Sequence, residues 1–243
     1  MAMIEKNNHD TSEINEFNQP VGFSVKNWQS RKKPAKSVLK GTYCILESLD
    51  IKKHAETLFD ALSADNHGES WTYLPYGPFV DCHAFKDWLK ATIAENDTLL
   101  YAIIDPKTKQ PIGVCSYLRI NPEHGSIEVG HLHYSKYLKK TPAATEAMYL
   151  MMHHAFEDLK YRRYEWKCHS LNQASRAAAL RLGFQFEGIF RQCNVFKGRN
   201  RDTAWFSIID REWPAIKKKF QKWLDAGNFD DNGSQRISLR NIE

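Results

Sequence analysis

The sequence has few cysteines and no apolar run long enough to cross a membrane. Its 243 residues include five cysteines, an odd number, and no two of them are spaced as Cys-x-x-Cys. Four of the five fall in apolar, strand-like runs, which is typical of buried free thiols in a reducing compartment. The first ten residues have no apolar segment of the length found in secretory signals. These features argue against a disulfide scaffold or a membrane protein and predict a cytoplasmic protein.

A strong charge of either sign is also missing. The net charge is +5, the isoelectric point is near 8.8, and lysines and arginines are scattered along the chain. That balance suits an anionic small molecule but falls short of a nucleic-acid-binding surface. Hydrophobic residues make up 42% and charged residues 26% of the chain, as in ordinary globular proteins.

Composition along the chain predicts one domain with two tails. Residues 1–35 are polar and predict an extended or flexible N-terminal arm, and residues 225–243 predict a polar C-terminal tail that frays. Residues 36–224 alternate between strand and helix patterns. The expected strands are 38–46, 99–105, 112–120, 126–134, 163–169, 184–196 and 203–210, and the expected helices are 52–63, 81–94, 142–160, 172–182 and 213–224.

The longest expected helix carries apolar residues at helical spacing. Met148, Met151 and Met152 recur with alanines and Leu159 along one side of this helix. Methionine fills irregular gaps in protein cores, so we expect these side chains to be buried.

The segment from Asn172 to Phe184 is the most informative part of the sequence. It has a polar start, an alanine-rich middle and a Gly-Phe exit, and it runs into Glu187-Gly188. Asn172 suits an N-cap, Ser175 the third helical position, and Gly183 the left-handed position after the last turn. Capping alone would explain these residues in any helix between two strands, so the segment by itself leaves a purely structural role open.

The segment resembles a motif of the GNAT superfamily of acyl-CoA-dependent N-acetyltransferases. The resemblance covers residues 36–224 and is nearest to the ribosomal-protein-alanine (RimJ/RimL-type) branch. The matching pieces are Gly41-Thr42-Tyr43, Leu46–Leu49, Ile127–Gly130, Ala144–Ala147, the Asn172–Phe184 segment, Glu187-Gly188 with Arg191, and Asp202 leading to Glu212-Trp213.

The resemblance implies both a fold and a reaction. The fold would be an α/β (α+β) GNAT fold, with a mixed, mostly antiparallel twisted sheet of about seven strands, flanking helices and a central β-α-β crossover. The reaction would transfer acetyl from acetyl-CoA to a primary amine in a ternary complex. The acceptor would be either a protein N-terminus or a small-molecule amine, and the protein would be a monomer or a homodimer.

Glu128 is the predicted general base, because the attacking amine has to lose a proton. Many relatives place a tyrosine seven residues after the motif asparagine to protonate the leaving thiolate, but Ala179 stands there. The resemblance therefore transfers the acid role to Ser175, with Asn172 ordering the site. Glu128 as an ordinary strand carboxylate and Ser175 as a capping residue are the structural alternatives.

The cofactor loop departs from the family pattern. Relatives carry glycines before the long helix, whereas this chain has Lys140 and Pro142 near those positions. Pro142 removes one backbone donor but suits the first turn of a helix capped by Thr141, whose N–H groups can still attract phosphate. The predicted cofactor-binding residues are His131, Leu132, Lys139, Lys140, Thr141, Ala143, Ala144, Thr145 and Asn172.

An aromatic, proline-rich loop lies between the first two expected helices. In this fold such a loop roofs the acceptor pocket, although it would equally serve as a plug over the core. The predicted substrate-binding residues are Trp71, Tyr73, Tyr76 and Glu187. His131-x-His133 shows no third ligand in the sequence, so we expect no metal.

A rival function remains open at this stage. Lys140, Pro142 and Ala179 fit a catalytically degenerate GNAT domain that binds a partner or RNA. Glu128 and Ser175, with Asn172, fit a working enzyme.

Overall fold

The structure is a computed structural model that describes residues 12–64, 68–231 and 233–242. The chain divides into two compact units, residues 1–30 and residues 31–243. In the first unit, β1 (Glu13–Ile14) pairs antiparallel with β2 (Pro20–Val21). The part of the predicted arm at residues 1–11 lies outside the described residues, and the predicted domain boundaries stay predictions. No helix in the described ranges is long and apolar enough to span a membrane.

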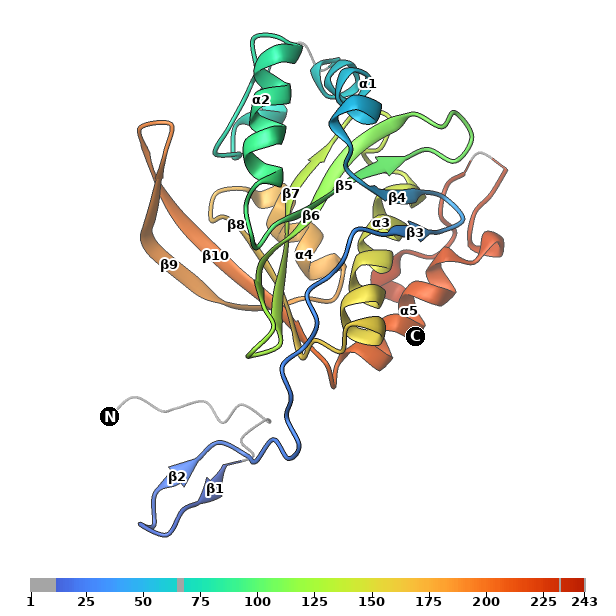
Figure 1. The fold of residues 1–243 in the computed structure, drawn as a ribbon. Helices are drawn as coiled ribbons and strands as arrows, with labels where there is room; N and C mark the ends of the chain where they lie inside the picture. Colours follow the sequence, from blue (N-terminus) through green and yellow to red (C-terminus); the bar gives the residue numbers. More distant parts are fainter. Residues whose placement is uncertain (1–11, 65–67, 232, 243) are drawn as a thin grey trace. The chain divides into compact units, whose positions relative to one another are not determined.

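The second unit is built on an eight-stranded sheet, counted over the described residues, with the order β3-β4-β5-β6-β7-β8-β10-β9 (Figure 1). Neighbouring strands are antiparallel except for β7 and β8, which are parallel and flank α3 in the sequence. This arrangement confirms the predicted α/β fold class. The strands are β3 (Val38–Lys40), β4 (Ile45–Ser48), β5 (Leu99–Ile104), β6 (Pro111–Asn121), β7 (Ser126–Tyr134), β8 (Arg163–His169), β9 (Gln185–Phe196) and β10 (Arg199–Ile209). The helices are α1 (Ile51–Ser63), α2 (Cys82–Ile93), α3 (Pro142–His153), α4 (Gln173–Arg181) and α5 (Trp213–Leu224), with short turns at Glu69–Trp71, His154–Asp158, Ala226–Asn228 and Leu239–Asn241.

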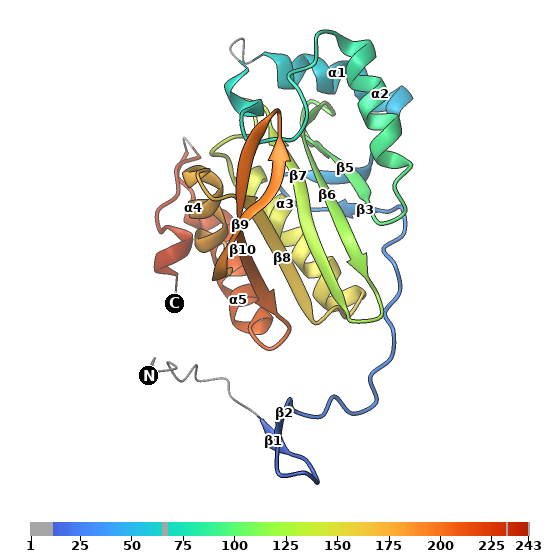
Figure 2. The ribbon, with the colours of Figure 1, turned by 90° about the vertical axis from the view of Figure 1, so that its left-hand side faces the viewer.

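The sheet separates two hydrophobic cores. Successive strand residues point to opposite faces, and the buried residues of β6 follow that rule: Val114 packs with α1 and α2, whereas Cys115 and Tyr117 pack with α3 and α5. Figure 2 shows α3 behind β7 and β8, with α1 and α2 at the other end of the unit. β5 and the first seven residues of β6 are thus covered on both faces, whereas β9 is exposed along most of its length.

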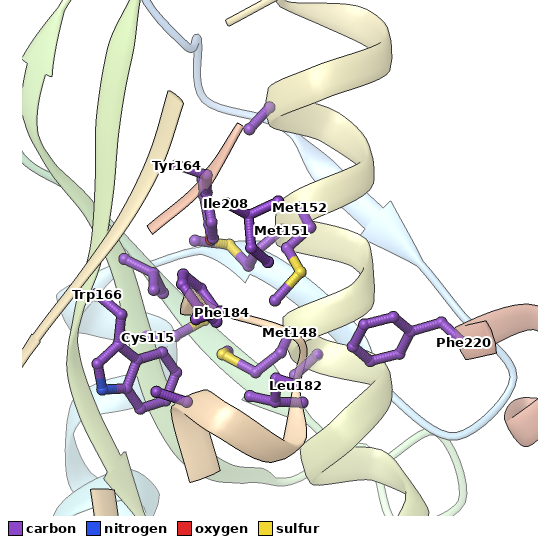
Figure 3. Packing of buried hydrophobic residues seen from close by; sticks show 14 of the residues in the cluster. Cys115, Met148, Met151, Met152, Tyr164, Trp166, Leu182, Phe184, Ile208 and Phe220 are labelled. Atoms are coloured by element: carbon purple, nitrogen blue, oxygen red, sulfur yellow. The ribbon is translucent and has the colours of Figure 1, made fainter. Parts of the chain in front are cut away.

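The methionines of α3 lie in the larger core, as predicted. Met148, Met151 and Met152 are at most 1% exposed and point toward the aromatic residues of β8 (Figure 3). The predicted helix to residue 160 does not continue as an α-helix, because His154–Asp158 forms a π-helical turn. Tyr117 donates its hydroxyl to the carbonyl of Met151 at 2.6 Å just before this turn.

The C-terminal stretch packs against the domain, and the prediction that it frays is wrong. Leu239 and Ile242 are buried in the larger core. Asn228, also buried, donates to the carbonyls of Trp223 and Ile237 at 3.0 and 3.1 Å. The apolar residues here are too sparse to form a periodic pattern, so only tertiary contacts reveal their burial.

The two parallel strands part midway, and this opening positions the site. β7 and β8 pair from Ser126–Arg163 to Val129–Trp166 and are not paired beyond that point in the described residues. At the same level β7 bulges, since two of its residues, His131 and Leu132, stand opposite one residue of β6. His131 has a φ of 48°, which a bulge of this kind requires.

Candidate active site

A cavity of about 350 Å³ lies where β7 and β8 part. Its walls come from five regions of the second unit: the strands β6 to β8, the start of α4, the aromatic loop after α1, the turn after α2, and the β9–β10 hairpin. The lining residues are Ser70, Tyr73, Leu74, Pro75, Tyr76, Glu95, Leu118, Arg119, Glu128, Val129, Gly130, His131, Leu132, Trp166, Lys167, Cys168, His169, Asn172, Ser175, Phe196 and Arg201.

Glu128 is the buried carboxylate of this cavity. It is 3% exposed and forms ion pairs with Arg119 and Lys167, each at 2.8 Å. Burial raises the pKa of Glu128, and the two cations oppose that rise. A carboxylate that is fixed in position and has a raised pKa is suited to accept a proton.

The sheet register explains why a cation stands beside Glu128. Glu128 of β7 lies directly opposite Glu165 of β8. Two neighbouring carboxylates repel each other unless a cation lies between them. Lys167, two residues along the same face of β8, binds both carboxylates at 2.8 Å and lies 3.6 Å over the Trp205 ring.

The bulge of β7 places a histidine on the cavity wall. His131 Nδ1 is 2.9 Å from the Tyr76 hydroxyl, and the two rings stack. Burial lowers the pKa of His131, so its neutral form is favoured. Gly130 beside it permits close packing of β6, because a Cβ there would lie 2.4 Å from Leu118.

Asn172 and Ser175 lie on the wall formed by α4. The Asn172 side chain accepts the N–H of Ser175 at 3.0 Å, so it is the predicted N-cap. Ser175 Oγ accepts the indole N–H of Trp166 at 3.0 Å. Both residues thus have a structural role, and both also line the cavity near Cys168.

The aromatic loop contributes two of its three predicted side chains. Tyr73 and Tyr76 line the cavity. Trp71 does not, because it is 4% exposed and packs beneath them against Phe79 and His133. This part of the loop therefore also plugs the smaller core.

Glu187 is not a cavity residue in this structure. Its carboxylate binds the guanidinium of Arg163 and accepts the hydroxyl of Ser207 at 2.6 Å. The assignment of Glu187 to substrate binding thus has no support from its position, since these contacts give it a structural role.

The predicted cofactor loop lies outside the cavity. Thr141 is the N-cap of α3, as expected, and accepts the N–H of Ala144. The N–H of Ala144 is thus bound within the helix cap, and the assignment of Ala144 to phosphate binding stays a prediction. Ala143 and Thr145 are buried, and Thr145 Oγ1 accepts from Arg181 at 3.0 Å. Lys139 and Lys140 are exposed.

The sequence did not predict that three cationic residues, Arg119, Lys167 and Arg201, would line the cavity. Their neighbours in the sequence carry no motif, and their grouping depends on the register between strands.

The described residues contain no group of three or more His, Cys, Asp or Glu side chains that could hold a metal ion. His131 and His133, which alternate on β7, are directed to different partners, Tyr76 and Ser70.

Comparison with known proteins agrees with this geometry. Residues 45–185 match the acetyltransferase (GNAT) domain family. A GCN5-related N-acetyltransferase from Brucella melitensis is 44% identical, with a TM-score of 0.88, over 90% of this chain and 99% of that one. An uncharacterized N-acetyltransferase, p20 of Bacillus licheniformis, is 29% identical over 58% of this chain and 80% of its own. The ribosomal-protein-serine acetyltransferase of Escherichia coli is 29% identical over 44% of this chain and 59% of its own.

The family match covers more than half of the 243 residues. The structural match extends over nearly the whole Brucella protein. Together with the parted strands and the cavity between them, these matches lead to one conclusion. The chain belongs to the GNAT family of acetyltransferases, enzymes that transfer an acyl group from acyl-CoA to an amine.

Proposed function

We propose that this protein transfers an acetyl group from acetyl-CoA to the α-amino group of a polypeptide by direct attack in a ternary complex. One observation carries the proposal: the buried carboxylate of Glu128 lines the same small cavity as Ser175 and Asn172. The cavity thus holds a proton acceptor on one wall and a hydroxyl on another.

The reaction removes two protons from the acceptor ammonium and adds one to the CoA thiolate, and the cavity has a group for the first removal and for the addition. Glu128 takes the proton of the acceptor ammonium, directly or through a water. The neutral nitrogen then attacks the thioester carbonyl, and backbone N–H groups of His131 and Leu132 stabilise the resulting oxyanion. The C–S bond breaks, the nitrogen gives its second proton to solvent as the amide forms, and the thiolate of CoA takes a proton from Ser175. The Ser175 oxygen regains a proton from solvent.

The choice of a polypeptide acceptor has two supports. The E. coli relative is by its name an acetyltransferase of a ribosomal protein. The acceptor side of the cavity is lined by Tyr73, Pro75 and Phe196 and also by charged residues, which suits a chain end that has both apolar and polar parts.

The start of α3 is the proposed phosphate site for CoA. Lys139 and Lys140 are exposed just before the helix, and Thr141 caps it. A helix N-terminus with neighbouring lysines attracts phosphate even without the glycines of relatives. Asn172 and the bulge at His131-Leu132 would contact the uncharged arm of the cofactor inside the cavity.

Replacing Lys140 by alanine tests this phosphate site. We expect the Kd of acetyl-CoA to rise about threefold to tenfold, as for one exposed charge-assisted contact, and the loss to shrink at high salt. Isothermal titration measures both effects. Lys107→Ala removes an exposed lysine from the β5–β6 turn and is the matched control. Equal affinities for the wild type and the Lys140 variant would show that the phosphates of CoA bind at another place.

Replacing Ser175 by alanine tests the general acid. A thiol has a pKa of about 8.5. Below that pH the leaving thiolate has to be protonated, so the proton donor matters most there. We expect kcat to fall about tenfold at neutral pH and to approach the wild-type value above about pH 9. Trp166→Phe is the control, because it removes the indole N–H that Ser175 accepts and keeps the hydroxyl. A loss that is the same at every pH would leave Ser175 with a structural role only.

The proposed function is tested with acetyl-CoA and a set of acceptors. The set contains peptides with free N-termini, the same peptides with blocked N-termini, and a polyamine. Release of CoA and a mass gain of one acetyl group at the α-amino nitrogen are expected for free N-termini only. Acetylation of the polyamine but of no peptide would overturn the choice of acceptor and keep the chemistry. RNA binding with no affinity for acetyl-CoA would favour the rival binding module.

A further inference from the structure

Three cations and two carboxylates line the cavity, and the carboxylates are Glu95 and Glu128. Arg119, Lys167 and Arg201 line it. Arg119 is paired with Glu128, and Lys167 is paired with both Glu128 and Glu165. No ion pair joins the third cation, Arg201, to any residue in the described ranges.

Arg201 is half-buried, and part of its guanidinium has no hydrogen-bond partner. Its Nε is buried and unpaired in the described part of the chain. The guanidinium lies 4.6 Å from the centre of the Phe196 ring, which also lines the cavity. Burial lowers the pKa of Arg201, but arginine stays charged under any physiological condition. A buried donor of this kind costs free energy unless a ligand satisfies it.

The neighbouring acid is not available to Arg201. The Asp202 carboxylate accepts the N–H of Gln192 at 2.7 Å and the side-chain N–H of Asn200 at 3.0 Å. These bonds stabilise an irregular step in the β9–β10 pairing between Arg201 and Thr203. Asp202 therefore shapes the hairpin and leaves Arg201 without a counter-ion.

The hairpin that carries Arg201 is tied to the aromatic loop. Lys197, at the hairpin tip, donates to the carbonyl of Trp71 at 2.9 Å. The tip and the loop that bears Tyr73 and Tyr76 thus enclose the same end of the cavity. We assign the acceptor to this part of the cavity, next to the thioester, because Tyr76 of the loop also contacts His131 on the bulge.

The charges of the reactants known from the family do not explain why an arginine without an ion-pair partner lines the cavity. The acetyl group and the arm of CoA next to it are uncharged, and the acceptor amine binds as a cation, which Arg201 repels. An anionic group near the amine would satisfy both the charge and the unpaired donors, because guanidinium and carboxylate match in geometry.

We infer that Arg201 binds a carboxylate of the acceptor, so that the substrate class is an amine with a carboxylate close by. This inference rests on the proposed function and deepens it. Two sources have that chemistry: the α-carboxylate of a free amino acid, and an acidic side chain near the N-terminus of a polypeptide. Polyamines and other purely cationic amines are disfavoured.

Matched acceptors test the inference in the full-length protein. Peptide pairs differ only by Asp or Asn at the second or third position, and free amino acids are compared with their amides. For the wild type, we expect kcat/KM to be about tenfold to a hundredfold higher for the acid than for the amide, mainly through KM, as one charge-assisted contact provides. A preference within the peptides assigns the acidic side chain, and a preference among the amino acids assigns the α-carboxylate; both support the inference.

Variants of Arg201 link the preference to this residue. Arg201→Ala and Arg201→Gln should bring the acid-to-amide ratio down to about one, and Arg201→Lys should keep part of it. Arg199→Ala, an exposed arginine of the same hairpin that does not line the cavity, should keep the wild-type ratio. Melting curves of each variant show whether it is folded.

The outcomes separate the inference from the proposed function. Equal rates for acids and amides in the wild type would overturn the inference while acetyl transfer itself stands. Arg201→Ala could instead lower kcat by the same factor for every acceptor. That result would assign Arg201 to the reacting carbonyl and would also overturn the inference. Absence of acetyl transfer to every acceptor would instead refute the proposed function, on which the inference depends.

Discussion

Replacing Glu128 by glutamine is expected to lower kcat/KM by about 10²-fold to 10⁴-fold at neutral pH, the usual contribution of a general base. Glutamine keeps the size of the side chain and an acceptor for Arg119 or Lys167 but takes no proton. The rate of CoA release with a peptide acceptor measures the effect. The loss should be largest at neutral pH and below, where the amine is protonated and depends on the base.

The change of the rate with pH distinguishes a general base from a structural carboxylate. A base works in its deprotonated form, so the wild-type rate should rise with pH through the pKa of Glu128, which burial raises. In the glutamine variant that step should vanish, and the residual rate should follow the amine itself, with a pKa near about 8. Thermal melting of the variant checks that the fold survives. An unchanged pH–rate profile would remove Glu128 from catalysis and leave it as a structural ion pair.

Replacing Glu146 by alanine is expected to destabilise the domain by about 3–5 kcal/mol. The carboxylate of Glu146 is buried under the turn before β4, where it accepts the N–H groups of Thr42, Tyr43 and Cys44 at 2.8, 2.6 and 2.8 Å. Alanine would leave one buried and two partly buried backbone donors without an acceptor, each costing up to about 1–3 kcal/mol before any water enters. Denaturant unfolding measures the free energy, and the Tm should fall by about 6–20 °C.

Two further variants test the same contact. Glu146→Gln keeps one carbonyl oxygen and should cost less than Glu146→Ala. Gly41→Ala should also destabilise, because its Cβ would lie 2.3 Å from the Glu146 carboxylate. If Glu146→Ala changed the unfolding free energy by less than about 1 kcal/mol, the three N–H groups would have another acceptor, and the contact would not hold β4 to α3.

The fold was largely predictable because it depends on local patterns. Alternating apolar runs marked the long strands, and the methionines at helical spacing marked the buried side of α3. Single residues also carried clear signals: Asn172 caps α4 and Thr141 caps α3, as their positions predicted. The family resemblance supplied the mixed, mostly antiparallel sheet with its central β-α-β crossover, which no local pattern contains.

The cavity was less predictable because it depends on contacts between strands. The sequence shows Glu128 and Lys167 but not that the register places Glu165 beside both of them. Nor does it show that the hairpin brings Arg201 to the aromatic loop, since these residues are far apart in the chain. The assignments of Glu128, Ser175 and Asn172 to catalysis stay predictions, as does the phosphate site at Lys139–Thr145.

Acetyl-CoA has to bind for the proposed function to hold, although the cofactor loop has Lys140 and Pro142 near the usual glycine positions. Isothermal titration of the purified protein with acetyl-CoA, and with free CoA in parallel, measures that binding. We predict binding with a micromolar Kd and a stoichiometry of one per chain. No heat of binding at millimolar acetyl-CoA would contradict it and would mean that the protein, although it belongs to the family, does not use this cofactor.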